Sequence, residues 1–435
     1  MVCQRFRISV RAFVVVVVVT LSLVAWAAQG ILGASKITIS FHSWMAAEKT
    51  SGGVGVLEYA EKLYEKEHPN IDINTVPLPY EETLNQFTVM SAAGNAPDIT
   101  LIDVAWLAQI AAMGNVETLD EYLPKSMVDD MFPSTLAEGR IRGKLYALPW
   151  NQNPNCMVYN KTLMKKAGLD PETAPRTMDE LDKAIAAIGN LGPDIQGIAL
   201  NGTLDAFSAD YLHPWLWNFG GEVLDTKGNV IINQEGGVKT FKWLKNLVDK
   251  KYMKAGLGIR EIRVLFAQEK VGFMLEGPWI KGILENLSEK GTEFNKEWAM
   301  VPIPKGPAIK GEYGYANPSS HMLVLSKASK HKKEAFDYMK FLVTDPRVTR
   351  DYFANTGLMP ILKSQLMSWS EFKSPFAQAA LLQMQYTRIP NAWGPKWQGL
   401  GTAIMKATQK VLMENADVIT TLNALAKELQ RMLKQ

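Results

Sequence analysis

Cysteine is scarce in this sequence, with only Cys3 and Cys156 among 435 residues. Cys3 lies in an N-terminal segment that we expect to be removed, which leaves one thiol and no intramolecular disulfide. Burial of a large core, rather than cross-linking, must therefore stabilise the fold. Long apolar runs are also scarce, because the one prominent run lies near the N-terminus. Together with a mean hydropathy of −0.07, this excludes a membrane protein with several spans.

The sequence also lacks an excess of charge of either sign. It has 47 Lys and Arg against 44 Asp and Glu, and three of the cations are Arg5, Arg7 and Arg11. Without these three arginines, 44 cations balance 44 anions. Such a chain offers no cationic surface to a phosphate backbone, so we expect no nucleic-acid partner. A composition of 47% hydrophobic and 21% charged residues is that of a globular protein, and the length indicates two or three domains.

Motifs of catalysis and cofactor binding are missing as well. The five histidines are scattered, without partners at metal-ligand spacing. Neither a Gly-x-Ser-x-Gly elbow nor a P-loop occurs, and Gly53-Val-Gly55 is followed by Glu58 where a dinucleotide loop needs its third glycine. No carboxylate spacing indicates an acid/base pair. We therefore predict no catalytic residue, no metal and no cofactor, and we do not expect an enzyme.

The N-terminus predicts export. Three arginines precede a largely apolar stretch from Phe13 to Trp26, and small residues follow, with Ala27 or Ala34 as the cleavage point. A membrane anchor is the alternative, but the stretch is shorter than the ~20 residues that a spanning helix needs. Residues 1–34 are thus predicted to form a cleavable signal peptide, and the mature protein to be periplasmic or otherwise extracytoplasmic.

Hydrophobic periodicity predicts a mixed α/β fold. Residues 36–41 alternate like a strand, residues 56–64 have a helical period, and residues 71–76 alternate again. Strands and helices that alternate at this spacing indicate parallel βαβ units. Further strands are expected at 98–102, 271–275 and 321–325, and further helices at 83–93, 178–188, 238–248, 332–343 and 400–433. Because no low-complexity linker separates the domains, we expect the chain to cross between them more than once.

Tryptophan, in contrast, is abundant, with twelve residues. Four of them follow predicted strands, namely Trp44, Trp106, Trp150 and Trp279. Open α/β sheets bind ligands beyond the carboxyl ends of strands, and a flat indole matches the apolar face of a pyranose ring. Asp, Asn, Glu and Gln side chains would then satisfy the sugar hydroxyls. The alternative for each tryptophan is a place in the core, which is the better interpretation for Trp243 and Trp298.

Several segments resemble extracellular solute-binding proteins of ABC importers, in the sugar-binding group that includes maltose-binding protein. The similarity runs from about Lys36 to the C-terminus, and the segments occur in the order of the family. They are Ala93-Gly-Asn-Ala-Pro-Asp-Ile99, Gly143-Lys-Leu-Tyr-Ala-Leu-Pro149, Tyr159-Asn-Lys161 with Lys166-Ala-Gly168, Pro175-Arg-Thr-Met-Asp-Glu-Leu181, Gly272-Phe-Met-Leu-Glu-Gly-Pro-Trp279, and Ser326-Lys327 leading into Glu334-Ala-Phe-Asp-Tyr-Met-Lys-Phe341.

The resemblance implies a type II periplasmic-binding-protein fold, in which two α/β lobes are joined by a hinge with multiple chain crossings and helices end the chain. Residues 36–150 and 316–357 would form the first lobe, and residues 151–315 and 358–435 the second. A sugar would bind unaltered in the cleft between the lobes. The closed receptor, a monomer, would then present it to the permease subunits of an ABC importer in the cytoplasmic membrane.

The resemblance also implies which residues contact the sugar. Trp279 and Trp397 match cleft aromatics of the family, and Asp103 and Trp106 lie in a loop that contacts sugar hydroxyls. Asn153 stands where the maltose binder has a glutamate, which is a departure from that protein. The predicted ligand-binding set is Trp44, Gln86, Asp103, Trp106, Trp150, Asn151, Asn153, Tyr211, Trp215, Glu276, Gly277, Trp279, Tyr315 and Trp397.

Other functions stay open at this point. The same fold could bind a glycerol-phosphodiester, which calls for Arg or Lys in the strand-end loops, or a polyamine, which calls for several carboxylates around the tryptophans. The strand-end loops carry no Arg or Lys for a phosphodiester. Only two acidic residues, Asp103 and Glu276, lie near the tryptophans to bind a polyamine. A secreted glycan-active enzyme is the alternative from another class. It would convert a glycan, whereas a receptor returns its ligand unchanged.

Overall fold

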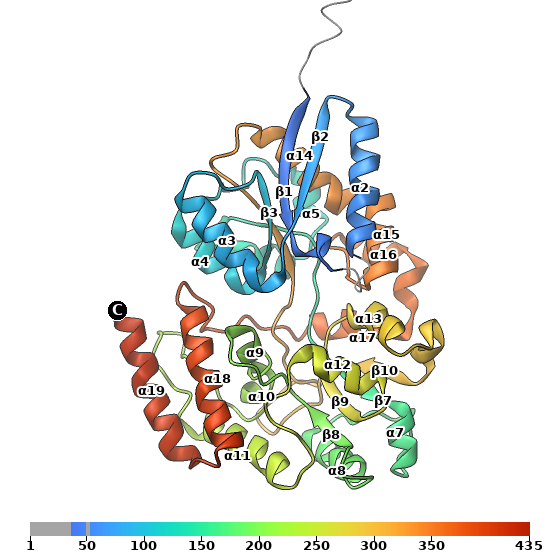
Figure 1. The fold of residues 1–435 in the computed structure, drawn as a ribbon, viewed down its shortest axis with the longest axis vertical. Coiled ribbons are helices and arrows are strands. Elements are labelled where there is room, and N and C mark those ends of the chain that lie inside the picture. Colours follow the sequence, from blue (N-terminus) through green and yellow to red (C-terminus); the bar gives the residue numbers. More distant parts are fainter. Residues whose placement is uncertain (1–35, 49–52) are drawn as a thin grey trace, which may run out of the picture.

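The computed structural model describes residues 36–48 and 53–435, so the predicted signal peptide lies outside the described residues. The described chain forms two lobes, one above the other in Figure 1, and each lobe contains its own β-sheet. Within these residues, no helix is long and apolar enough to cross a membrane. The prediction of an α/β protein with two lobes is confirmed.

The first lobe is built on a five-stranded sheet in the order β2-β1-β3-β11-β6. Its strands are β1 (Ile37–Ser43), β2 (Ile71–Pro77), β3 (Ile99–Asp103), β6 (Leu148–Pro149) and β11 (His321–Leu325). β1 pairs in parallel with β2 and β3, as the predicted βαβ units require. β11 enters from far along the chain and runs antiparallel to β3 and β6. Every residue of β3 is buried, which is expected of a central strand covered on both faces.

The second lobe is built on a four-stranded sheet in the order β10-β7-β9-β8. Its strands are β7 (Cys156–Asn160), β8 (Gln196–Ala199), β9 (Val271–Glu276) and β10 (Trp298–Val301). β8 and β9 are parallel, whereas β7 runs antiparallel to both of its neighbours. Cys156 is a free, buried thiol whose pKa is raised by burial, so it serves as a packing residue. A separate hairpin pairs β4 (Arg140–Ile141) with β5 (Lys144–Leu145).

Helices surround both sheets (Figure 1), and α18 and α19 pack together at the end of the chain. Some of the helices begin after a capping side chain. Thr177 and Glu180 form a reciprocal capping box at α8, and Asp417 caps α19. In chain order the helices are η1 (Trp44–Ala46), α2 (Gly53–Glu67), α3 (Tyr80–Ala92), η2 (Val104–Trp106), α4 (Leu107–Met113), α5 (Lys125–Asp129), α6 (Pro133–Glu138), α7 (Lys161–Lys166), α8 (Met178–Gly189), α9 (Ala206–Asp210), α10 (His213–Asn218), α11 (Glu235–Asp249), α12 (Ile259–Ala267), α13 (Ile280–Leu287), η3 (Gly291–Lys296), α14 (Lys332–Thr344), α15 (Pro346–Thr356), α16 (Lys363–Ser368), η4 (Ser370–Lys373), α17 (Pro375–Met384), α18 (Trp397–Met413) and α19 (Val418–Lys434).

Three segments of the chain connect the lobes and are bonded to one another. The chain leaves the first sheet after β6, returns between β10 and β11, and leaves again after α15. The Ser319 amide donates to the Asn153 carbonyl at 2.7 Å, and the Met359 amide donates to Asn153 Oδ1 at 3.0 Å. Asn151 Nδ2 donates to the Tyr352 hydroxyl at 2.7 Å and so ties the first crossing to α15. Multiple crossings between the lobes are therefore confirmed.

The residue boundaries of the two lobes stay predictions, because the third crossing contacts both. The Lys363 amide donates to the Asp130 carbonyl, in the first lobe, at 2.7 Å. Trp369 and Phe372 belong instead to a buried cluster that contains Val158 of β7 in the second lobe. The segment after α15 thus packs against both lobes along its length.

Candidate functional site

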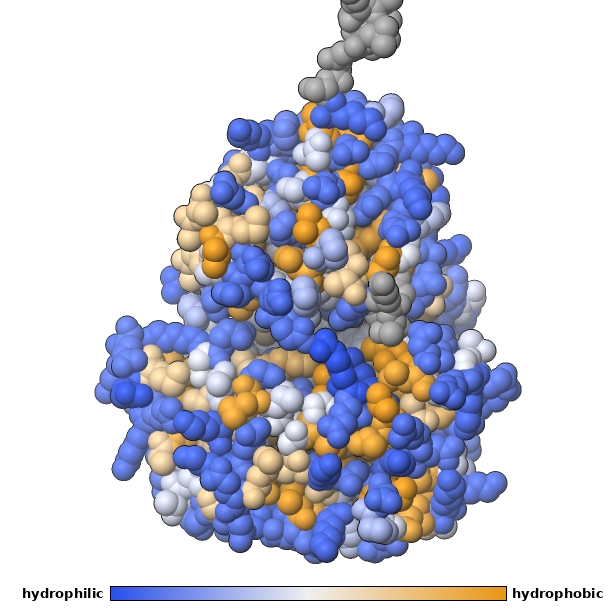
Figure 2. Space-filling view, viewed as in Figure 1, coloured by the Kyte–Doolittle hydropathy of each residue, from blue (hydrophilic) through white to orange (hydrophobic). Residues whose placement is uncertain are grey.

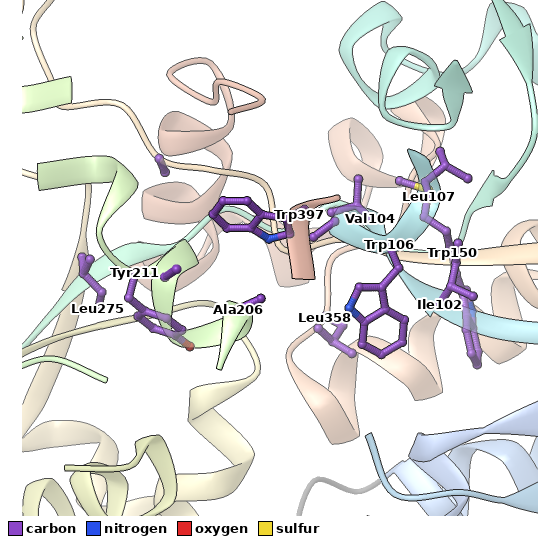
Figure 3. Close-up of a cluster of buried hydrophobic side chains, with 14 of the residues drawn as sticks. Ile102, Val104, Trp106, Leu107, Trp150, Ala206, Tyr211, Leu275, Leu358 and Trp397 are labelled. Carbon is purple, nitrogen blue, oxygen red and sulfur yellow. The ribbon is translucent and has the colours of Figure 1, made fainter. Parts of the chain in front are cut away.

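A cavity of about 660 Å³ lies between the lobes. Trp44, Asp103 and Trp279 line it, and these residues end or follow β1, β3 and β9. Figure 2 shows the surface hollowed between the upper and the lower lobe. The crossing segments contribute Ser319 and Leu358, and Figure 3 shows Leu358 beside the tryptophan of η2. The cavity therefore occupies the place where open α/β sheets bind ligands, beyond the carboxyl ends of strands.

Aromatic side chains form the wall that the first lobe contributes. The centroid of the Trp44 ring is 5.2 Å from that of Tyr80 and 5.7 Å from that of Trp106, and the latter two rings are 4.9 Å apart. His321 lies edge-on to Trp44 at 5.0 Å. Burial lowers the pKa of His321 to about 3, so its ring is neutral. Because each ring is packed against others, the indole faces are held in place before any ligand arrives.

The second lobe contributes a tryptophan held by a buried ion pair. Glu276 ends β9 and accepts hydrogen bonds from Arg263 Nε at 2.5 Å, Arg263 Nη2 at 3.2 Å and Trp279 Nε1 at 2.5 Å. The indole lies over Gly277, where an added Cβ would be 2.1 Å from a ring carbon, so no larger residue fits there. Trp279 is half-buried, and these contacts fix how it faces the cavity.

Asp103 places a carboxylate in the wall at the end of β3. Its Oδ1 accepts from the Ala105 amide at 2.8 Å, and its Oδ2 accepts from the Tyr80 hydroxyl at 3.1 Å. Burial nevertheless raises the pKa of Asp103 to about 6, because two bonds do not replace full hydration. Burial also raises the pKa of nearby Glu138 to about 8, and the Asp103 charge adds to this shift. Ionising Asp103 in the wall, or Glu138 behind it, is therefore costly.

Asp210 is the corresponding carboxylate of the second lobe. It ends α9, lines the cavity, and accepts from Trp393 Nε1 at 2.7 Å. Burial raises its pKa well above the usual value, and the Asp103 charge raises it further. Phe207, at spacing i, i+3 with Asp210, contacts the Tyr80 ring at 5.4 Å, so aromatic rings of the two lobes meet here.

One buried hydrogen-bond donor in the cavity wall lacks a partner. Asn201, two residues beyond β8, is 3% exposed, and its Nδ2 has no hydrogen-bond partner among the described residues. Its Oδ1 accepts from Thr203 Oγ1 at 3.3 Å, which sets the orientation of the amide. An unpaired buried donor costs ~1–3 kcal/mol, and an oxygen of a ligand in the cavity would remove that cost.

The arrangement suits a flat, polar ligand. Indole faces can cover the apolar face of such a ligand, and carboxylate and amide groups can bond to its rim. Within the described part of the chain, no group of three or more His, Cys, Asp or Glu side chains could hold a metal ion.

Four residues of the predicted ligand-binding set line the cavity: Trp44, Asp103, Trp106 and Trp279. Three others lie one position away from a lining residue, with Gln86 next to Asn85, Tyr211 next to Asp210, and Trp397 next to Gln398. Each pair lies in or at the end of a helix, where a step of one residue turns the side chain by about 100°. Figure 3 shows Tyr211 and Trp397 within the buried cluster on the side of the second lobe.

The remaining predicted residues do not line the cavity: Trp150, Asn151, Asn153, Trp215, Glu276, Gly277 and Tyr315. Trp150 stacks on Tyr352 with centroids 5.0 Å apart and ring planes at 4°, in the buried cluster drawn in Figure 3. Trp215 packs on Trp243 at 4.8 Å. Asn151 and Asn153 bond the crossing segments together, and Glu276 and Gly277 position the neighbouring indole.

Sequence reasoning missed several lining residues, namely Tyr80, Asn201, Asp205, Phe207, Asp210, Arg260, Arg263 and His321. The spacing of Phe207 and Asp210 was a usable signal, since residues three apart share a helix face. No sequence signal pointed to Arg260 and Arg263, because they reach the cavity from α12 and not from a strand-end loop. Only the packing of the two lobes brings these residues together.

Two α/β lobes joined by several crossings, with an aromatic-lined cavity between them, define a two-lobe solute-binding protein. The sequence bears this out at residues 46–346, which match the family described as bacterial extracellular solute-binding protein. The chain belongs to this family, and the resemblance seen in its sequence is confirmed.

Relatives cover most of the chain. A protein of Brucella abortus, described as a binding protein without a stated ligand, is 25% identical over 420 residues, which is 95% of this chain and 97% of that protein. The maltotriose-binding protein of Pyrococcus abyssi is 24% identical over 77% of this chain and 70% of its own length. Among solved structures, the GacH receptor of Streptomyces glaucescens, determined unliganded and with acarbose, has a TM-score of 0.79 at 24% identity, covering 92% of this chain and 99% of that one. This structural likeness shows the fold alone.

Proposed function

We propose that the protein is the substrate-binding receptor of an ABC importer and binds a sugar or oligosaccharide in the cavity between its lobes. The observation that carries this proposal is the set of Trp44, Trp106 and Trp279 beside carboxylate and amide groups. Indole faces match pyranose rings, and the polar side chains bond to hydroxyls at the ring edge. Membership of the solute-binding family and similarity to a maltotriose-binding protein support the choice.

The size of the cavity supports a small polar ligand. Its volume of about 660 Å³ falls inside the range of roughly 300–1,000 Å³ that small-molecule sites occupy. We infer that it has room for an oligosaccharide. Asn201 supplies a donor, and Asp103 and Asp210 supply acceptors, so hydroxyls on opposite sides of a sugar would find partners on both lobes.

Delivery depends on closure of the lobes. A ligand that contacts both lobes stabilises the closed form by its higher affinity for that form. The crossing segments support such a motion, since a few connecting residues can absorb the change in backbone angles. The receptor, exported by residues 1–34 and monomeric, then presents its closed face to the permease subunits outside the cytoplasm.

The cavity disfavours one alternative function and partly supports another. A glycerol-phosphodiester needs a free cation, but Arg260 and Arg263 are paired with Glu81 and Glu276. A glycan-active enzyme needs two carboxyl groups in one cleft, one of them with a raised pKa. The aspartates of the two lobes meet that description, which makes an enzyme the second candidate.

Mass spectrometry of the ligand released by denaturing freshly purified protein tests the proposal. We expect a saccharide that is depleted in Trp106→Ala and retained in Trp369→Ala, because Trp369 lies outside the cavity lining. The saccharide should return unchanged after long incubation with the protein. A ligand without sugar would contradict the ligand class, and a cleaved or extended glycan would favour the enzyme.

A further inference from the structure

Two buried carboxylates face the cavity without a cationic partner among the residues that the structure describes. Asp103 comes from the first lobe and Asp210 from the second, and they are 7% and 8% exposed. Their hydrogen bonds come from neutral donors, namely the Tyr80 hydroxyl and Ala105 amide for Asp103 and the Trp393 indole for Asp210. None of the ion pairs within the described chain includes either aspartate.

The two arginines that line the cavity are already paired. Arg263 binds Glu276 through two hydrogen bonds of 2.5 and 3.2 Å, and Arg260 binds Glu81 at 2.8 Å. Buried charges in proteins are normally paired, because an unpaired one loses its hydration without compensation. The two arginines therefore provide no countercharge for Asp103 or Asp210 when these aspartates are ionised.

The charge of Asp103 also acts on Asp210. Burial is the largest cause of the raised pKa of Asp210, and the charge of Asp103 is the second largest. Burial also raises the pKa of Tyr80, and the charges of both carboxylates raise it further. All three groups line the same cavity. Tyr80 bonds to Asp103 at 3.1 Å, and its ring is 5.4 Å from that of Phe207, which lies three residues before Asp210 in α9 of the other lobe. Like charges brought together in a low-dielectric site oppose closure unless a proton or a cation is held with them.

The surrounding walls suit a cation. Trp44, Tyr80 and Trp106 form one aromatic wall, and Phe207 meets Tyr80 from the opposite lobe at 5.4 Å. The negative face of an aromatic ring attracts a cation, and tryptophan does so most strongly. The unpartnered amide of Asn201 offers a donor for a ligand oxygen in the same cavity. One site thus provides for a positive nitrogen and for hydroxyl groups.

We propose that the ligand is an amine-bearing sugar, held with its protonated amine between Asp103 and Asp210. This rests on the proposed function and narrows its ligand class. The amine supplies the charge that the carboxylates lack, and because it contacts both lobes its binding favours the closed form. A neutral sugar would give the two carboxylates hydroxyl partners but no countercharge.

Titration calorimetry with matched disaccharides at neutral pH tests the inference. The probes are the glucosamine disaccharide with free amines, its N-acetylated form, and cellobiose, which carries a hydroxyl in place of each amine. Spermidine serves as an amine without sugar. We expect the free-amine disaccharide to bind at least about tenfold more tightly than the acetylated form or cellobiose, as charge-assisted bonds are stronger than neutral ones.

Asparagine variants of each aspartate remove the negative charge and keep the shape of the side chain, so they show how much of the affinity depends on charge. Asp103→Asn and Asp210→Asn should each weaken binding of the free-amine disaccharide roughly 10- to 100-fold and change binding of cellobiose much less. Asp182→Asn is the matched control, because Asp182 also accepts from an indole, Trp243 Nε1 at 2.8 Å, but lies outside the cavity lining. Melting followed by circular dichroism verifies that each variant is folded, and the two aspartates give independent measurements.

The outcomes distinguish this inference from the proposed function. Cellobiose or the acetylated disaccharide binding as tightly as the free-amine form would overturn the inference and leave a sugar receptor intact. Spermidine binding without any disaccharide would support a cationic ligand and overturn the sugar receptor. Absence of heat from all four probes would overturn the inference.

Discussion

Arg260 of α12 and Glu81 of α3 form an ion pair of 2.8 Å that joins the second lobe to the first. Both residues line the cavity, and their side chains are 74% and 58% exposed, so the pair lies at the rim. Beside it, Tyr80 contacts Phe207 of the opposite lobe. Contacts between the lobes therefore exist at the rim of the cavity.

Removal of this rim contact should favour the open form. Arg260→Ala should weaken ligand binding by at most about fivefold, because exposed ion pairs contribute little. It should also raise the radius of gyration of the ligand-free protein in small-angle scattering, while saturating ligand restores the compact value. High salt should reproduce the effect in the wild type, since salt screens exposed charges.

Arg176→Ala is the matched control for the rim variant. Arg176 pairs with Glu312 at 2.6 Å with similar exposure, 65% and 59%, but both residues follow β7 and precede β11, so the pair lies within the second lobe. Neither affinity nor radius of gyration should change. An equal effect of both variants, or no ligand-dependent compaction in the wild type, would contradict a rim contact that acts through closure.

Trp150 should behave as a core residue. It is 1% exposed and stacks on Tyr352, so Trp150→Ala should lower the free energy of unfolding by ~3–5 kcal/mol. Sugar affinity of the folded fraction should stay unchanged, and Trp150→Phe should recover part of the stability. Denaturant unfolding and titration of the same samples measure both quantities. A loss of affinity at full stability would mean that this indole contacts the ligand.

Glu138 should make stability depend on pH. Burial raises its pKa to about 8 in the folded state, so the folded protein keeps a proton that the unfolded chain releases above its ordinary pKa of 4.5. This contribution is complete below the unfolded pKa and is lost as the pH rises through about 8. Relative to Glu138→Gln, the wild type should lose roughly 4 kcal/mol of stability between about pH 5 and pH 8.

Denaturant unfolding of both proteins at several pH values checks this. The comparison with Glu138→Gln cancels the titration of groups that do not interact with Glu138, such as His321. A difference in stability that stays constant with pH would show that Glu138 is ionised in the folded protein.

The elements that the sequence predicts well are those with strong local periodicity. The strand expected at 271–275 occurs as β9 (Val271–Glu276), and the helix expected at 178–188 occurs as α8 (Met178–Gly189). β7 and β10 were not predicted as strands. All five residues of β7 are buried, so it lacks the alternation that marks a strand with one solvated face.

The site was predictable only in part, because position along a strand does not specify the direction of a side chain. Trp44, Trp106 and Trp279 lie in, or directly precede, helices that follow strands, and all three line the cavity. Trp150 also follows a strand, but it begins the crossing to the other lobe, and its ring turns onto α15. The acidic and basic residues of α9 and α12 reach the cavity through tertiary packing alone.

Whether the cavity binds a sugar is decided most directly by titrating wild-type, Trp279→Ala and Trp369→Ala protein with a panel of mono- and oligosaccharides, with a melting curve for each variant. Trp279 is half-buried and lines the cavity, whereas Trp369 packs on Phe372 away from it. Stacking worth ~1–3 kcal/mol, taken by analogy with stacked bases, predicts that Trp279→Ala weakens binding roughly 5- to 150-fold with little change in melting. Trp369→Ala should lower the melting temperature and leave affinity intact. No binding of any saccharide by the wild type, or unchanged affinity in a destabilised Trp279→Ala, would contradict a sugar site in this cavity.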